Sequence, residues 1–478
     1  MMKKKIIISI ISGVILFAGA GCKKFLDVNS DPAGADKVDD NLLLAGVQIQ
    51  DAFNISGGFP AKVTSFWTQQ LSYMQTQPNW ESYKVIAADW ENTWAYNLYP
   101  GALKNLKMLE AQANVGGHAH YEGIAKILIA FNLAHATDLW NAVPYSDGFK
   151  GLDNITPKYD SQESIYQTIF TLLDDAIKLL QGANTSVVKP DAKDLVYGKF
   201  SGAGTQVDHW IKFAWLLKAR YSLRLINAPD GKRTARIDDA LAAVDKSFPD
   251  ASYNAGVKFA TTSGNEAPWF QFINNWGSTV MAATLIDMLK KSQDPRLEVM
   301  ATTNEAGEYV GHVNGVSEGQ VAEFSGVGDF FTAADQTVFF GTYDELLFIK
   351  AEATYLKSGF SAAQSTLDDA VKATMTRYGL DPNSQAVADY LDANCKLTAA
   401  NAYNVIMTEK YISNFLSIEA FNDWRRTNLP VLNVANNAYL NMKAVPRRFL
   451  YPGSELETNP QPQQPGAMTE RVWWDTKQ

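Results

Sequence analysis

Cysteine is scarce in this chain of 478 residues, which contains only Cys22 and Cys395. Two cysteines cannot build the disulfide framework of a small secreted domain, so packing must stabilise the fold. If Cys22 is chemically modified, no intramolecular disulfide can form.

Clusters of basic residues are also missing. The chain has 42 Lys and Arg against 51 Asp and Glu, a net charge of −9. Without residues 1–21, which hold three lysines and no acidic residue, the net charge is −12. An acidic chain without a basic patch argues against a nucleic acid as partner.

Sequence motifs of common enzyme classes are absent as well. The five histidines include no His-x-x-x-His pair, and neither a Gly-x-Ser-x-Gly elbow nor a Walker-type phosphate loop occurs. Acidic residues are too numerous for a glycosidase pair to be selected from sequence. We therefore predict no catalytic residue, no metal site and no cofactor, and we expect a protein that is not an enzyme.

Only one long apolar run occurs, and it lies at the start of the chain. Lys3–Lys5 precede the fifteen residues from Ile6 to Ala20, and Gly21 and Cys22 follow. As a helix this run would span about 22 Å, short of the roughly 30 Å of a bilayer core. The arrangement is typical of a secretion signal.

Cys22 resembles the processing site of lipoproteins, where the cysteine becomes the lipidated first residue of the mature chain. Gly19 stands where such sites usually have a leucine-like residue, and an ordinary secretory signal with an incidental cysteine is the alternative. Two or more acyl chains would give a stable membrane anchor. We expect residues 1–21 to be the signal and residues 22–41 to be a flexible tether.

Helical periodicity dominates the rest of the chain. Asn41 can cap a first helix, and Gly116-Gly117 separates two long helical segments. The spacing of apolar residues predicts helices over 42–49, 61–74, 87–113, 119–139, 162–181, 208–226, 234–248, 399–416 and 418–426.

Two further segments differ from this pattern. Residues 250–340 are rich in Gly, Asn and aromatic residues, so we expect loops and a few short strands there. From Tyr343, small and aromatic residues around Gly359 resemble a degenerate tetratricopeptide helix pair, with a plain helical hairpin as the alternative. We expect a mostly α fold, in which one domain over 42–478 has a tetratricopeptide-like scaffold (about 42–249 and 341–426) and a loop-rich insertion (about 250–340).

Several segments in order resemble the SusD/RagB family: Phe25–Asn29 with Asp31-Pro32, Thr137–Trp140 with Val143–Tyr145, Asp294–Arg296, Thr342–Ala353, Phe421–Arg426 and Pro446–Pro452. This resemblance implies a lipoprotein on the outer-membrane surface of Bacteroidetes-type bacteria. It also implies that the protein binds an oligosaccharide or a peptide and delivers it to a SusC-like TonB-dependent barrel. The charged motif residues Asp344, Glu345, Glu352, Arg425 and Arg426 are expected to form internal ion pairs.

Two aromatic segments are suited to bind a ligand, because a flat ring stacks on a sugar face while Asn and Gln bind hydroxyls. They are Gln77–Tyr83 and Ala267–Gly277, and we expect both to be loops. Phe330 and Phe331 form a third, weaker candidate. The predicted ligand-binding residues are Asn79, Trp80, Tyr83, Trp269, Asn274 and Trp276.

Other interpretations stay open from sequence. The aromatic residues of both segments can be core anchors beneath a loop, and core packing is expected for Trp90, Trp94, Trp210 and Trp215 at helical positions. For the whole chain, a helical-repeat adaptor without a ligand site and an extracellular glycan hydrolase are the alternatives.

Overall fold

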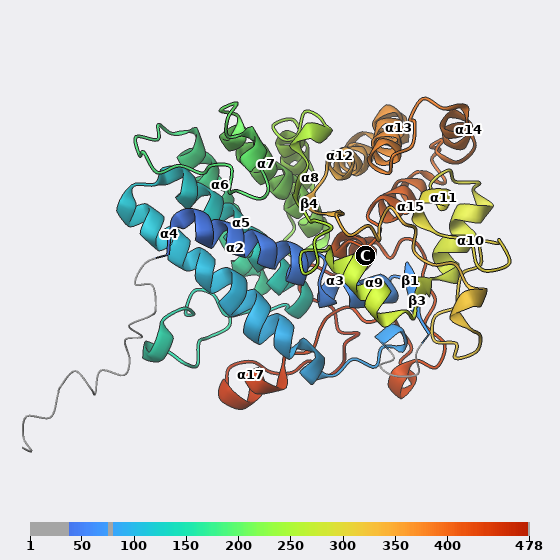
Figure 1. The fold of residues 1–478 in the computed structure, drawn as a ribbon, viewed down its shortest axis with the longest axis horizontal. Coiled ribbons are helices and arrows are strands. Elements are labelled where there is room, and N and C mark those ends of the chain that lie inside the picture. Colours follow the sequence, from blue (N-terminus) through green and yellow to red (C-terminus); the bar gives the residue numbers. More distant parts are fainter. Residues whose placement is uncertain (1–37, 75–79, 477–478) are drawn as a thin grey trace, which may run out of the picture. The chain divides into compact units, whose positions relative to one another are not determined.

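Helices make up most of the structure, and local sequence explains where many of them begin and end (Figure 1). The computed structural model describes residues 38–74 and 80–476, and all of these except residues 38 and 39 belong to one compact unit. The first half of the chain contains α2 (Asp40–Gln50), the π-helix η2 (Asp51–Ser56), α3 (Phe59–Trp67), the π-helix η5 (Asn92–Lys104), α4 (Asn105–Gly116), α5 (Ala119–Trp140), α6 (Gln162–Gln181), α7 (Gln206–Arg224) and α8 (Arg233–Val244). The second half contains α9 (Pro268–Trp276), α10 (Ala283–Lys291), α11 (Leu297–Met300), α12 (Tyr343–Ser358), α13 (Phe360–Arg377), α14 (Gln385–Asn394), α15 (Ala402–Ser413), α16 (Ile418–Thr427) and α17 (Gly453–Thr458).

Helix boundaries follow recognisable capping residues. At the start of α6 the Ser161 side chain accepts a hydrogen bond from the Ser164 N–H at 3.2 Å, and Thr342 caps α12 in the same way. Gly117 ends α4 with a φ of 68°, a left-handed conformation that glycine adopts without steric cost. The predicted break between two long helices at Gly116-Gly117 is therefore confirmed.

Consecutive helices form a continuous row. Each helix from α4 to α8 packs on the next, α8 packs on α12, and α12 packs on α13. In Figure 1 this row runs from cyan α4 to orange α13. The apolar face of α6, with Ile165, Ile169 and Leu173, is buried within it.

The predicted helix pair after Tyr343 is confirmed as α12 and α13. Phe348 and Ala351 of α12 pack with Ala363, Leu367 and Ala370 of α13 in one hydrophobic cluster. The small side chains allow the two helices to approach closely, as in tetratricopeptide pairs. The mostly α fold is confirmed, whereas the boundaries proposed for the insertion and the tether stay predictions.

The strands are short and form two separate pairs. Strand β1 (Leu71–Tyr73) pairs antiparallel with β3 (Thr279–Met281), and β2 (Ala255–Lys258) pairs antiparallel with β4 (Thr337–Gly341). The predicted helix over 61–74 is wrong after Trp67, because Gln69 has a φ of 58° and the chain then enters β1. Residues 250–340 contain the expected short strands and also helices α9, α10 and α11, which were not predicted.

Most of the tryptophans at helical positions pack inside the molecule, as predicted. Trp90 stacks on Phe449 with ring centroids 3.6 Å apart, Trp94 packs edge-on against Trp140, and Trp210 is fully buried. Trp215 differs, because it is only half-buried and carries the ammonium groups of two lysines over its ring. No helix within the described ranges combines the length and the apolar character that crossing a membrane requires.

Candidate ligand-binding cleft

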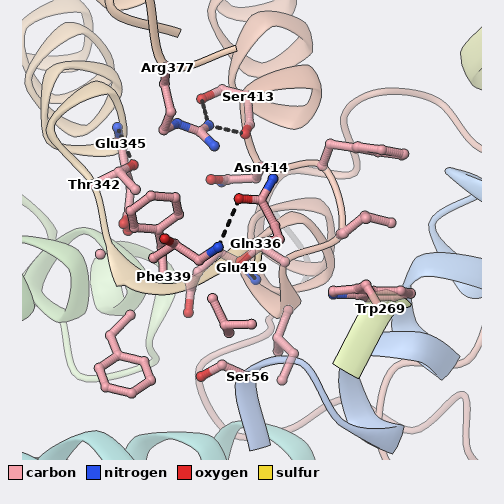
Figure 2. Close-up of a pocket in the computed structure, with 18 of the residues that line it drawn as sticks. Ser56, Trp269, Gln336, Phe339, Thr342, Glu345, Arg377, Ser413, Asn414 and Glu419 are labelled. Atoms are coloured by element: carbon pink, nitrogen blue, oxygen red, sulfur yellow. Dashed lines mark hydrogen bonds between the residues drawn. The ribbon is translucent and has the colours of Figure 1, made fainter. Parts of the chain in front are cut away.

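A cavity of about 110 Å³ lies where three segments that are distant in the sequence meet (Figure 2). Its walls come from the start of helix α9, from residues 330–342 including β4, and from residues 413–419 between α15 and α16. Two side chains from α5 and one each from η2, α7, α12 and α13 complete the lining. Both the helical row and the segment 250–340 therefore contribute to one cavity.

Aromatic rings form the apolar part of the lining. Phe330 is the most open of them, with 37% of its surface exposed, whereas Trp269 is 5% exposed. Phe331 holds this wall in place, because its ring packs edge-on against Phe415 at 4.9 Å and against Tyr378 at 5.0 Å. The rings are thus fixed by packing and do not need to reorganise before a ligand enters.

Arg377 forms part of the polar lining. Its Nη2 donates to the Asp344 carboxylate at 2.7 Å and to the Ser413 carbonyl oxygen at 2.7 Å. Burial alone would raise the pKa of Asp344, but the guanidinium of Arg377 lowers it below the ordinary value. Figure 2 shows the Arg377 side chain reaching down from its helix beside Ser413, with Asn414 and Gln336 below it.

A second arginine, Arg220, is paired at another part of the lining. Its Nε and Nη2 donate to the two Glu345 carboxylate oxygens, each at 2.6 Å, and Nη2 also donates to the Phe340 carbonyl oxygen at 2.7 Å. Two parallel charge-assisted hydrogen bonds hold both groups in a fixed geometry. The Arg220–Glu345 pair therefore forms a rigid part of the cavity wall and leaves no net charge there.

His135 is neutral in this environment. Its Nδ1 lies 2.9 Å from the Phe131 carbonyl oxygen, so Nδ1 carries the proton and donates. Burial lowers the pKa of His135 below its ordinary value. Among the residues whose placement the structure gives, no group of three His, Cys, Asp or Glu side chains is arranged to hold a metal ion.

Two polar groups of the lining have no hydrogen-bond partner among the described residues. The Nδ2 of Asn414 is buried, and this side chain is 7% exposed. The buried hydroxyl of Ser56, at the end of π-helix η2, is unpaired in the same way. A buried polar group without a partner costs free energy, so such groups indicate places where a bound molecule completes the hydrogen bonding.

Trp80, a predicted ligand contact, lies in a cluster of aromatic rings. It is 7% exposed, stacks on Tyr73 at 5.5 Å and packs edge-on against Phe59 at 5.1 Å. It belongs to the short 3₁₀ helix η3 (Trp80–Ser82) and does not line the cavity. This placement is the one that the core-anchor alternative predicts.

Tyr83 is also buried, at 1% exposure. Its hydroxyl accepts a hydrogen bond from the Ala435 N–H at 2.8 Å, which ties this segment to the loop after α16. Burial raises the pKa of Tyr83 to about 12. The first predicted segment is thus built into the core at both of these residues, while Asn79, like Cys22, lies outside the described residues.

The second predicted segment is helix α9, so the expected loop over Ala267–Gly277 is wrong. Pro268 occupies the first turn, and Gly277 ends the helix with a φ of 58° while its N–H donates to the Ile273 carbonyl oxygen. Trp269 lies in the cavity wall, and Asn274 is exposed further along the helix. Trp276 is its last residue, and its side chain is outside the described part.

Sequence reasoning missed the polar lining. Arg377, Asn414 and Ser56 carry no local pattern that separates them from other polar residues near helix ends. They come together only because three distant segments meet, which no spacing rule describes. Phe330 and Phe331, the weaker aromatic candidate, do line the cavity.

The charged motif residues form the internal ion pairs that were predicted for them. Glu352 binds Arg426 and Lys410, Asp344 binds Arg377, and the side chains of Glu352 and Arg426 are fully buried. Arg425 is the exception, because its Nη1 donates to the carbonyl oxygens of Asp138 and Arg447. Burial lowers the pKa of Arg425 to about 10.

Residues 35–452 match the sequence model of the SusD-like family, which is described as starch-binding and associating with the outer membrane. No curated protein matches the chain in sequence. Among solved structures, a chitin-binding protein is 24% identical with a TM-score of 0.78, and the match covers 92% of this chain and 100% of that protein.

Two further solved structures are similar over nearly the same range. A SusD/RagB family protein from Bacteroides thetaiotaomicron is 24% identical with a TM-score of 0.74, covering 92% of this chain and 99% of that one. A chitin-binding SusD homolog from Flavobacterium johnsoniae is 20% identical with a TM-score of 0.74, covering 92% of this chain and 98% of that one. At these identities the structural likeness shows the fold alone.

Proposed function

The chain belongs to the SusD-like family of proteins associated with the outer membrane, and from that premise we propose that it captures an oligosaccharide and delivers it to a SusC-like TonB-dependent transporter. Of the predicted contacts, we propose that Trp269 binds the ligand directly, with Asn274 and Trp276 further along the same helix. Trp80 and Tyr83 would support this region from the core.

The observation that carries the proposal is the cavity between α9, residues 330–342 and residues 413–419. It combines rings fixed by packing with buried polar groups that have no partner, which is the composition of a sugar site. Glycan-binding proteins among the structural relatives are consistent with this chemistry. Because the cavity is small, only part of a glycan is enclosed, and we expect modest affinity at a single site.

The test is calorimetric binding of a glycan and peptide panel to the full-length protein in detergent. Trp269→Ala should reduce glycan affinity by at least about tenfold, since the lost ring contact is worth about 1.4 kcal/mol or more. Trp215→Ala is the matched control, because Trp215 is half-buried on α7 and does not line the cavity. If the protein binds only peptides, its ligand is a peptide and not an oligosaccharide. If it hydrolyses a glycan, the alternative of an extracellular hydrolase is supported.

We also propose that a lipid on Cys22 anchors the protein at the cell surface. Replacing Cys22 by serine should release the protein from the membrane fraction without changing its glycan affinity. Co-purification of the wild-type protein with a large barrel would support the transporter partner. A membrane-associated Cys22→Ser variant would contradict the anchor, and a protein that binds the barrel but no ligand would support the adaptor alternative.

A further inference from the structure

We infer that the cavity receives the acetamido substituent of an N-acetylated sugar, an inference that rests on the proposed glycan-binding function. The juxtaposition that carries it is the unpaired amide of Asn414 beside Arg377, facing a wall of aromatic rings. Nothing in the proposed function itself specifies which glycan is bound.

The cavity is large enough to enclose a substituent of a sugar but not a whole sugar ring. An apolar cavity of about 150 Å³ accommodates one benzene molecule. The cavity here measures about 110 Å³, so a pyranose with its hydroxyl groups cannot enter it completely. The sugar ring must therefore stay at the mouth, where Phe330 is exposed, while one substituent points inward.

The unpaired Nδ2 of Asn414 requires a ligand that accepts a hydrogen bond. The Asn414 side chain makes no hydrogen bond to the described residues, although its Nδ2 is buried. A primary amide offers N–H donors and a carbonyl acceptor. An acetamido group supplies the carbonyl acceptor that this Nδ2 lacks.

Charge balance excludes the main competing substituents. The charged lining groups are already paired: Arg377 with Asp344, Arg220 with Glu345, and Glu419 with Arg224. An entering carboxylate or ammonium group would lose its hydration without gaining a counter-ion, which is costly in a buried site. A neutral substituent is therefore favoured over a uronate or a free amine.

The aromatic wall distinguishes an acetamido group from a hydroxyl. A hydroxyl could satisfy Asn414 but would leave the faces of the surrounding rings against water. The methyl of an acetamido group would instead bury apolar surface against rings such as Phe339 and Phe331, at a gain of about 25 cal/mol per Å². Polar and apolar parts of the cavity thus match the two ends of one substituent.

The experiment compares three β-1,4-linked hexamers that share a glucose-type backbone: chitohexaose, cellohexaose and the fully deacetylated chitosan hexamer. Calorimetry with the full-length protein should give at least about tenfold tighter binding of chitohexaose than of either other ligand, as expected for one buried hydrogen bond and a methyl contact. Equal affinities for chitohexaose and cellohexaose would overturn the inference and leave the proposed function intact. Absence of binding to every glycan of the wider panel would overturn both.

Asn414 variants test the residue that carries the inference. Asn414→Leu keeps the branch point and the number of non-hydrogen side-chain atoms and removes an unpaired N–H donor, while the backbone N–H of residue 414 still donates to the Lys410 carbonyl at 2.9 Å. The variant should melt at the same or a higher temperature, bind chitohexaose at least about tenfold more weakly, and lose most of the preference for chitohexaose over cellohexaose. A merely structural residue would instead lose stability when it is replaced.

Asn414→Asp provides an isosteric second variant if the leucine protein does not fold. It exchanges the amide donors for a carboxylate, so chitohexaose binding should weaken by at least about tenfold. Unchanged preference for chitohexaose in either folded variant would overturn the assignment of Asn414. Loss of binding in Trp269→Ala together with unchanged binding in both Asn414 variants would place the acetamido contact elsewhere and equally overturn it.

Discussion

The buried ion-pair network around Glu352 and the polar lining of the cavity differ in how far their hydrogen bonds are satisfied. Glu352 of α12 accepts from Arg426 of α16 and from Lys410 of α15, and Lys410 also lies 2.9 Å from Asp423, so that only the Nε of Arg426 lacks a partner within this group. In the cavity, Asn414 and Ser56 keep buried polar atoms with no partner among the described residues. The paired charges stabilise the fold around Glu352, whereas the two open polar atoms of the cavity lining can still pair with a ligand.

The largest expected effect comes from breaking the buried ion-pair network around Glu352. Glu352→Ala leaves Arg426 and Lys410 buried without their shared carboxylate, and loss of one partner of such a cluster costs about 3 to 5 kcal/mol. We expect a large fall in the free energy of unfolding, measured by urea denaturation. A loss below about 1 kcal/mol would show that water or another group replaces the carboxylate as partner of Arg426 and Lys410.

Asp51 is a buried scaffold carboxylate that also departs from this pattern, because its two oxygens make no well-formed hydrogen bond among the described residues and only the Asn132 side chain opposes the effect of burial on its pKa. Burial raises the pKa of Asp51 well above its ordinary value. The group is therefore neutral in the folded state at low pH, and stability is lost as the pH rises from the unfolded pKa, about 3.9, towards the folded one.

Asp51→Asn removes this titration while keeping the shape of the side chain. We expect it to stabilise the protein at neutral pH, because the variant no longer bears the cost of keeping residue 51 protonated, about 1.4 kcal/mol for each pH unit between the unfolded and the folded pKa. The gain should grow with pH when urea denaturation curves of both proteins are compared from about pH 4 to about pH 8. A difference that does not change with pH would contradict a raised pKa for Asp51.

Regular periodicity made much of the helical row predictable. The segment 162–181 has apolar residues at helical spacing and a serine cap, and α6 occupies those residues. Helix α9 was predicted as a loop although Trp269, Phe272 and Ile273 are spaced as on one helix face and Pro268 and Gly277 mark its ends. Its short length and the two asparagines obscured that signal.

The cavity could be predicted only in part. The aromatic candidates Trp269 and Phe330 line it, because a local excess of rings is visible in sequence. The burial of Trp80 depends on partners such as Phe59 and Phe272, which lie far from it in the chain. Asn414 becomes a site residue only through the meeting of α13, the α15–α16 junction and residues 330–342.

Tyr83→Phe sharpens the distinction between core and site at a predicted ligand residue. The change removes the hydroxyl that accepts from the buried Ala435 N–H, so we expect a loss of about 1 kcal/mol in stability. Glycan affinity should be unchanged, since Tyr83 is 1% exposed and does not line the cavity. Reduced affinity at full stability would instead make Tyr83 the ligand contact that the sequence suggested.

The smallest effect is expected for an ion pair in the segment 250–340. Lys258 and Asp335 lie 3.6 Å apart with 71% and 47% of their side chains exposed, whereas Glu352 and Arg426 are fully buried. Asp335→Ala should change the free energy of unfolding by less than about 0.5 kcal/mol, and salt should reduce even that. Both variants remove one carboxylate from a Lys or Arg partner. Urea denaturation of Asp335→Ala and Glu352→Ala under the same conditions therefore compares an exposed ion pair with a buried one. Similar losses of unfolding free energy in the two variants would contradict this prediction. They would mean that the burial of an ion pair does not decide how much it stabilises the protein.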